Sequence, residues 1–131
     1  MDQLSKLLAN DSNGMITYEY IVNHENECDD RMPDIVENLK RIDNTGQFLA
    51  SSARFLHAVD RERFAEWIPM LIEGAIDKDK ERKYIGSLLE AIWGADYKEN
   101  ATRLQQEDDN FRRIFKRLYP ADAIGSIGHS F

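Results

Sequence analysis

The sequence predicts an all-α fold, a compact bundle of about six to seven short-to-medium helices that contains a duplicated antiparallel helical hairpin. Two observations support this prediction. Apolar residues recur at helical spacing along most of the chain, and the pattern of residues 58–75 is repeated in residues 75–92 with an offset of 17 positions. Residues 15–22 alone are rich in the aromatic and β-branched residues typical of strands. Because no second strand is evident to pair with their backbone, we predict a helix over 16–22.

The first half of the chain contains four predicted helices separated by turns. Leu4, Leu7 and Leu8 give residues 2–10 an apolar face, and the turn formers of 10–14 end that helix before the helix at 16–22. The polar residues 24–30 form a loop. Pro33 then suits the first turn of a helix. The apolar residues of this third helix and of a fourth at 48–59, which follows a turn at 44–46, have helical spacing: Ile35, Val36, Leu39, Ile42, Phe48, Leu49, Phe55, Leu56 and Val59.

The repeated segment is expected to form the hairpin. Its two copies place apolar residues at matching positions: Trp67, Ile68, Leu71, Ile72 and Ala75, then Tyr84, Ile85, Leu88, Leu89 and Ile92. Asp60 and Asp77 precede the two stripes and are predicted to be their N-caps. Pro69 and Gly86 occupy equivalent positions, and we predict a bend or break near Pro69 because proline removes an internal hydrogen bond.

The last part of the chain contains a weaker helix at 97–106 and a final amphipathic helix. Asp108 to Asn110 can cap this final helix, and Pro120 stops it. We therefore expect one helical domain over residues 1–119 and a flexible tail over 120–131, where glycine and serine are frequent.

Charge is unevenly distributed along this acidic chain. The net charge is −7, and residues 1–45 account for −6 of it, with ten acids and four bases. Such a chain is a poor general binder of DNA, because phosphate neutralisation requires clustered Lys and Arg. No apolar run reaches membrane-spanning length, and the first residues do not have the pattern of a signal peptide. Together with the single cysteine, Cys28, these features favour a cytoplasmic protein.

His24 and Cys28 are the only residues with spacing suggestive of a metal site. On a helix the i, i+4 spacing would let both bind one ion, but a closed zinc site requires about four ligands. We expect no metal and no cofactor here, and retain a small metal protein or enzyme around His24 and Cys28 as a weak alternative. No nucleophile has a base and an orienting acid at a recognisable spacing, so no catalytic residue is predicted and an enzyme is disfavoured.

The final helix is the strongest candidate for a binding surface. Its apolar residues Phe111, Ile114, Phe115 and Leu118 lie opposite a cationic face formed by Arg112, Arg113, Lys116 and Arg117. This face could contact a partner, or it could pair with the acidic N-terminal third within one chain or between subunits. Trp67 and Trp93 are further candidates, because tryptophan often dominates binding energy at interfaces.

These observations favour a non-enzymatic helical interaction or regulatory module. Its expected partner is another protein or a second copy of itself, and no binding to a membrane is expected. The alternative is a nucleic-acid-associated regulator that uses the basic C-terminal helix, although the acidic net charge speaks against nucleic acid.

Overall fold

The computed structural model describes residues 2–122 and confirms a compact all-α fold. Within this range the chain forms eight α-helices and no strand, so the predicted number of six to seven is too low. The helices are α1 (Gln3–Asn10), α2 (Met15–Asn23), α3 (Met32–Ile42), α4 (Gln47–Asp60), α5 (Ile68–Lys78), α6 (Gly86–Trp93), α7 (Ala101–Glu107) and α8 (Asp109–Leu118). Two 3-10 helices, η1 (Asp29–Arg31) and η2 (Pro120–Asp122), complete the regular structure.

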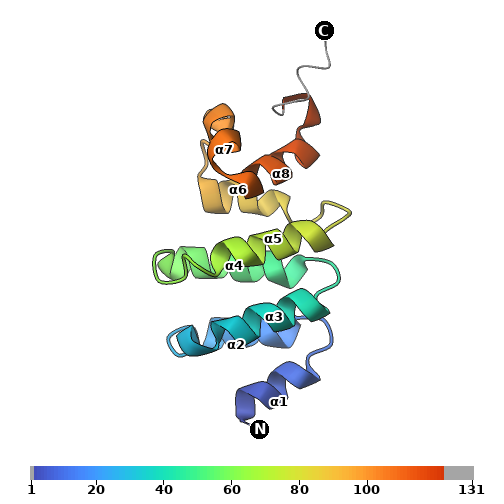
Figure 1. Cartoon of the computed structure of the whole chain (residues 1–131), viewed down its shortest axis with the longest axis vertical. Coiled ribbons are helices and arrows are strands. Elements are labelled where there is room, and N and C mark those ends of the chain that lie inside the picture. Colours follow the sequence, from blue (N-terminus) through green and yellow to red (C-terminus); the bar gives the residue numbers. More distant parts are fainter. Residues whose placement is uncertain (1, 123–131) are drawn as a thin grey trace.

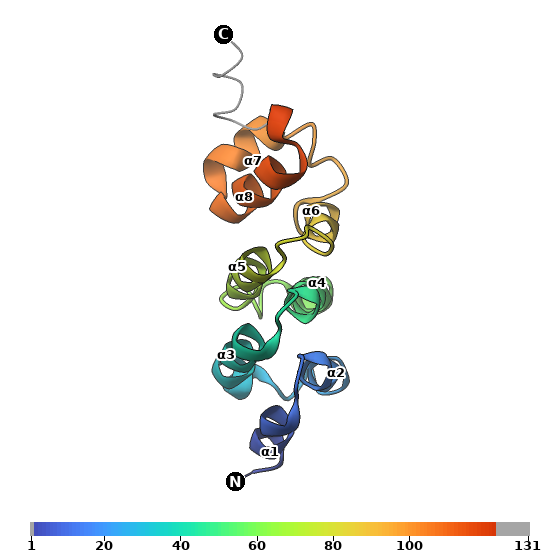
Figure 2. The same cartoon turned by 90° about the vertical axis from the view of Figure 1, so that its right-hand side faces the viewer.

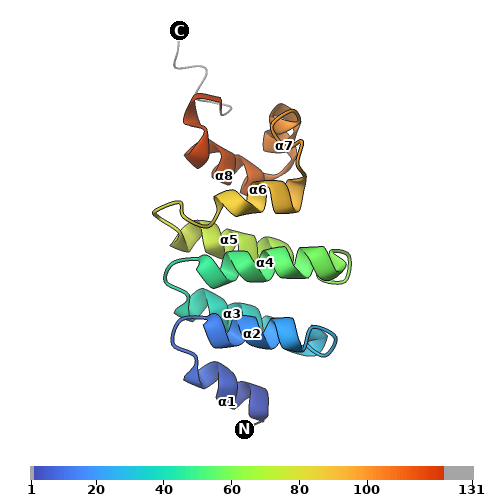
Figure 3. The ribbon, with the colours of Figure 1, turned by 180° about the vertical axis from the view of Figure 1, so that it is seen from behind.

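The helices are stacked in two layers along the longest axis of the molecule. One layer contains α1, α3 and α5, and the other contains α2, α4 and α6 (Figure 2). Seen from behind, α2, α4 and α6 lie one above another (Figure 3). The N-terminus lies at one end of the stack, and α7 and α8 close the other end (Figure 1). Leucine, isoleucine and phenylalanine side chains from all eight helices form one continuous core.

The segment at 15–22 is helical, as predicted. It forms α2, whose Thr17 and Ile21 are completely buried. In the predicted flexible tail at 120–131, Pro120–Asp122 form η2, and residues 123–131 lie outside the described part of the chain. The flexibility of the tail therefore stays a prediction.

The predicted duplicated hairpin is not confirmed. Asp60 is the last residue of α4, and Asp77 lies inside α5, so neither is an N-cap. α5 begins at Ile68 with Pro69 in its first turn, and Gly86 is the first residue of α6. α5 runs without interruption through Pro69 to Lys78, so the predicted bend or break near Pro69 is wrong. In the first turn of a helix, proline has no internal hydrogen bond to remove. α4 packs against both α5 and α6, and α5 also packs against α3 and α8, so the predicted pair is not a separate hairpin.

Three buried aspartates connect one layer to the other. Asp11, Asp43 and Asp79 each follow the last residue of a helix, α1, α3 and α5 respectively. All three are at most 5% exposed. Each carboxylate accepts backbone N–H groups at the start of the next helix, which would otherwise have no partner. Each aspartate thereby ties the end of one helix to the start of the next.

The Asp11 turn extends into a buried polar network. Asp11 Oδ2 accepts hydrogen bonds from the Thr17 backbone N–H at 2.7 Å and from the Thr17 hydroxyl at 2.6 Å. Asn38 Nδ2 donates to Thr17 Oγ1 at 3.2 Å and to the carbonyl oxygen of Leu8 at 3.3 Å. Burial acts to raise the pKa of the Asp11 carboxyl, but the bonds from Thr17, Gly14 and Asn13 outweigh it and lower the pKa below its usual value. The network fixes the turn between α1 and α2 against α3.

Ser52, unlike these buried polar residues, has a side chain without a hydrogen-bond partner among the described residues. It is completely buried in α4, and its hydroxyl has no hydrogen-bond partner within residues 2–122. A buried polar group without a partner costs about 1–3 kcal/mol. We therefore expect Ser52→Ala to raise the free energy of unfolding by about 1 kcal/mol, measured by urea denaturation.

The neighbouring residue provides the control for this prediction. The Ser51 hydroxyl accepts a hydrogen bond from Arg54 at 3.0 Å on the exposed side of α4. Ser51→Ala is expected to change the free energy of unfolding by less than about 0.5 kcal/mol. A destabilised Ser52→Ala protein would contradict the idea that this hydroxyl is an uncompensated cost.

Candidate functional site

The cationic face of α8 results from how this helix is capped and buried. The carboxylate of Asp108 accepts the backbone N–H groups of Asn110 and Phe111, at 3.0 and 3.3 Å, and so fixes the start of the helix. Phe111, Ile114 and Phe115 are buried against the core. The basic residues of α8 are thereby directed away from the core.

A groove of about 460 Å³ gathers these basic side chains at one end of the stack. It is lined by Arg82, Arg112, Arg113, Lys116, Arg117 and Pro120, and we call it the cationic groove. It therefore contains all four cations predicted from the final helix. Arg82 comes from the loop between α5 and α6, which lies beside α8 (Figure 1).

Arg82 is held in an unusual backbone conformation. Its φ angle is +59°, the only positive φ of a non-glycine residue within the described chain. L-residues in this left-handed region cost about 1–2 kcal/mol, so the surrounding structure must maintain it. The Arg82 N–H donates to the carbonyl of Asp79, whose carboxylate accepts the N–H groups of Lys83 and Tyr84. The Arg82 guanidinium donates to the carbonyl of Arg117 at 3.3 Å, at the C-terminal end of α8.

Three other guanidinium groups of the groove are also held by contacts within the chain. Arg113 pairs with Asp77 at 2.8 Å, and Arg117 donates to the carbonyl of Ile76 at 2.7 Å. Both contacts attach α8 to α5. Arg112 pairs with Asp109 at 2.6 Å on α8 itself.

Lys116 differs from the four arginines of the groove. It is exposed and has no ion-pair partner in the part of the chain that the structure describes. The cationic groove thus contains five bases, of which only Arg112 and Arg113 are paired with a carboxylate. The groove is strongly electropositive on a chain whose net charge is −7.

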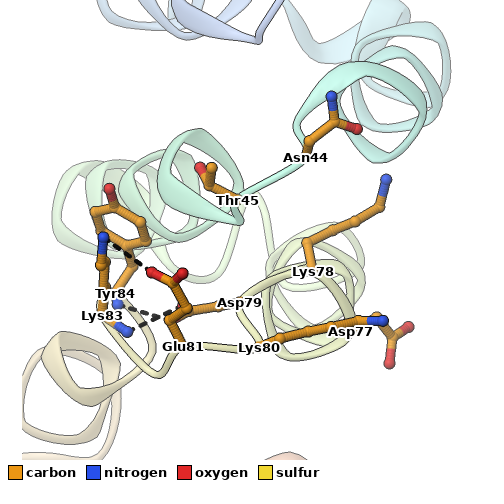
Figure 4. A pocket seen from close by; sticks show the side chains of 9 residues that line it. All are labelled: Asn44, Thr45, Asp77, Lys78, Asp79, Lys80, Glu81, Lys83 and Tyr84. Atoms are coloured by element: carbon orange, nitrogen blue, oxygen red, sulfur yellow. Dashed lines mark hydrogen bonds and ion pairs between the residues drawn. The ribbon is translucent and has the colours of Figure 1, made fainter.

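A second groove lies on the other side of the α5–α6 loop but has balanced charge. This groove has a volume of about 430 Å³. Figure 4 shows its lining, which consists of Asn44 and Thr45 of the α3–α4 turn together with residues 77–81, 83 and 84. Its three lysines, Lys78, Lys80 and Lys83, are accompanied by Asp79, Glu81 and Asp77, and Asp77 also pairs with Arg113 of the cationic groove. The Glu81 carboxylate, 2.9 Å from the Lys83 ammonium, raises the pKa of Lys83. This groove therefore lacks the excess of positive charge found on α8.

The two tryptophans lie outside the cationic groove. The Trp93 indole N–H donates to Asp108 Oδ2 at 2.9 Å, and its ring packs edge-on against Phe111, with centroids 5.2 Å apart. Trp93 therefore connects the end of α6 to the start of α8. Trp67 is half-buried against the core, directly before α5. Neither tryptophan lines the groove of basic side chains, although both were predicted as binding residues together with the bases of the final helix.

His24 and Cys28 are not assembled into a metal centre. Cys28 is completely buried, its thiol donates to the carbonyl of Glu25 at 3.4 Å, and burial raises its pKa. His24 stacks on Tyr20, with ring centroids 4.5 Å apart, and its Nδ1 lies 3.9 Å from Glu27. Within residues 2–122 no three His, Cys, Asp or Glu side chains are placed to share a metal ion.

The sequence analysis missed Arg82 as a member of the groove. Arg82 lies 30 residues or more from the other bases, in a run of alternating charges that is typical of an exposed loop. Asp77 was also misinterpreted, because it pairs with Arg113 and does not cap a helix. No local pattern in the sequence indicates that Arg82 lines the groove or that Asp77 pairs with Arg113.

Comparison with known proteins provides no relative for this chain. No protein-family model matches the sequence, no curated protein matches it, and no solved structure matches the fold. None of the helices within residues 2–122 is long and apolar enough to cross a membrane.

Proposed function

We propose that this chain is a non-enzymatic helical interaction module that binds an acidic segment of a partner protein in the cationic groove. The observation that carries the proposal is the gathering of five bases around one groove, with only two carboxylates paired to them, on an acidic protein. Complementary charge of this kind increases association rates and selects partners. The lining of the groove contains cations and a proline and offers neither a nucleophile nor a general base.

The arrangement of the helices argues against neutralisation of the groove by the chain's own acidic third. Within the described residues, α8 packs against α5, α6, α7 and η2. The helices of the acidic third, α1, α2 and α3, are separated from α8 by α4 and α5 (Figure 1). This arrangement favours an acidic segment of another molecule, which includes a second copy of this chain.

Binding of a short glutamate-rich peptide tests the proposal. We expect fluorescence anisotropy to detect binding that weakens as NaCl is raised from about 50 to 300 mM, because salt screens exposed charges. Combining Arg112→Gln with Lys116→Gln is expected to weaken binding about tenfold, since both side chains are accessible and do not attach α8 to α5.

A variant with the same change in charge provides the control. Lys6 on α1 is exposed, and Arg103 on α7 pairs with Glu107 outside the groove. The Lys6→Gln, Arg103→Gln double variant should bind the peptide as the parent protein does. Equal weakening by both double variants would show that only net charge matters and would contradict a site at α8.

Nucleic acid is the second candidate, because Arg and Lys in a groove also contact phosphates. A duplex DNA probe is therefore included in the same titration. The net charge of −7 disfavours a long polyanion, whereas a short acidic segment would contact only the groove. DNA binding tighter than peptide binding, lost in the Arg112, Lys116 double variant, would replace the proposed function by the nucleic-acid alternative.

A further inference from the structure

The cationic groove is built mainly from arginine, which restricts the anions it suits. Four of its five bases are arginines, Arg82, Arg112, Arg113 and Arg117. The planar guanidinium presents five N–H donors in a fixed fork that fits the oxygens of carboxylate and phosphoryl groups, whereas lysine acts as a point charge. An arginine-rich groove therefore favours an anion with several oxygen acceptors.

Contacts within the chain restrict these guanidiniums without using all of their donors. In the described contacts Arg82, Arg113 and Arg117 each donate through a single terminal nitrogen, to Arg117, Asp77 and Ile76 respectively. Each of these three guanidiniums therefore has further N–H groups for a ligand. Because the side chains are already held in place, a bound anion immobilises little additional side-chain freedom.

The charge balance of the groove favours a doubly charged ligand group. Five bases with only two paired carboxylates, Asp77 and Asp109, place unbalanced positive charge in a cavity of about 460 Å³. One glutamate of a ligand supplies a single negative charge. A phosphorylated serine or threonine supplies about −1.5 to −2 at neutral pH, together with three strong acceptor oxygens.

From this combination we infer that the groove recognises a phosphorylated serine or threonine within the acidic segment of a partner protein. This inference rests on the proposed function and specifies its ligand. Arginine clusters are a common means of binding phosphorylated motifs. A lipid surface is less suited, because the apolar residues of α8, Phe111, Ile114 and Phe115, are buried in the core and leave no apolar face to enter a bilayer.

Three peptides that differ at one central position test the inference. Each has the same flanking glutamates, with phosphoserine, glutamate or serine at the centre. We expect the phosphoserine peptide to bind about tenfold more tightly than the glutamate peptide, and the serine peptide to bind most weakly. The affinity of the phosphoserine peptide should also rise from about pH 5 to pH 7.5, because its phosphoryl group loses the second proton near pH 6. The affinity of the glutamate peptide should change less.

Arg82→Gly is the most informative variant for this test. Glycine adopts the φ of +59° without strain, so the loop backbone is preserved while the guanidinium is removed. We expect it to weaken phosphoserine binding about fivefold and glutamate binding less, because phosphate contacts are the stronger ones. The Lys6→Gln, Arg103→Gln variant again serves as the control, and circular dichroism checks that each variant is folded.

The possible outcomes separate this inference from the proposed function. Equal affinity for the phosphoserine and glutamate peptides would overturn the inference and leave the proposed function intact. Absence of binding by all three peptides would overturn both. Tighter binding to duplex DNA, or to vesicles rich in anionic lipid, would also overturn the inference by assigning the groove to another source of phosphate.

Discussion

Asp43→Ala is expected to lower the free energy of unfolding by about 3 kcal/mol, corresponding to about 10 °C in Tm for a chain of this size. Asp43 is only 1% exposed. Its Oδ1 accepts the N–H groups of Thr45 and Gly46 at 3.1 and 2.9 Å, and its Oδ2 accepts those of Phe48 and Leu49 at 2.9 and 2.8 Å. Alanine removes the acceptor of all four N–H groups, and those of the buried residues Gly46 and Leu49 are then left without a partner.

The size of this effect follows from the number of donors affected. Loss of an ordinary N-cap costs about 0.5–2 kcal/mol, usually because one or two N–H groups lose their acceptor. Asp43 serves four, and Leu49, one of the donors, is completely buried. The expected loss is therefore above the usual range for a cap.

Urea denaturation followed by circular dichroism measures the loss, with Asp60→Ala as the control. Asp60 is exposed at the end of α4, and among the described contacts its carboxylate accepts only the N–H of Arg63, at 3.1 Å. We expect its replacement to cost less than about 1 kcal/mol. Similar losses at Asp43 and Asp60 would show that the buried turn is not an important source of stability.

Gly46→Ala is expected to destabilise the protein by a similar amount, about 3 kcal/mol. Gly46 has φ +85°, where an L-residue is strained by about 1–2 kcal/mol. A Cβ atom at this position would lie 2.9 Å from the carbonyl oxygen of Ala75 and 3.1 Å from Cβ of Asp79. Because Ala75 lies in the last part of α5 and Asp79 directly follows that helix, the α3–α4 turn would have to move away from α5.

Gly86→Ala is the matched substitution for comparison. Gly86 is in a helical conformation at the start of α6, and a Cβ there would meet only the flexible end of Leu118, at 3.2 Å. We expect a change within about 0.5 kcal/mol. If Gly46→Ala and Gly86→Ala gave equal Tm values, the close approach of the α3–α4 turn to α5 would not limit stability.

The turn at 44–46 and the neighbouring Asp79 show where prediction from the sequence succeeded and where it failed. The turn at 44–46 was expected from its composition, and the structure has it between α3 and α4. The role of Asp79 was not expected, because Asp77 stands at the repeat position and is equally able to cap a helix. Only Asp79 is placed where its carboxylate can reach the N–H groups of Lys83, Tyr84 and Ile85.

The candidate site was predictable only in part. Arg112, Arg113, Lys116 and Arg117 could be identified because helical periodicity places them opposite Phe111 and Ile114. The groove itself depends on Arg82, which has a left-handed backbone conformation in the loop between α5 and α6. No local pattern in the sequence indicates that its side chain reaches α8. Trp93 could equally have been an exposed anchor, and its contact with Asp108 depends on the packing of α6 against α8.

Helical periodicity predicted most of the helices and their buried faces, including Leu71, Leu88 and Phe111, because it is a local property of 10 to 20 consecutive residues. The number of helices and the start of α5 were not predicted. Tertiary structure alone decided the two-layer stack, the choice among aspartates as caps and the inclusion of Arg82 in the cationic groove. The physical reason is that these features depend on contacts between segments up to about 40 residues apart, where several polar residues could serve equally well and only burial selects one. For the same reason, the charge of the final helix was evident from the sequence, whereas the shape that would make it a binding site was not.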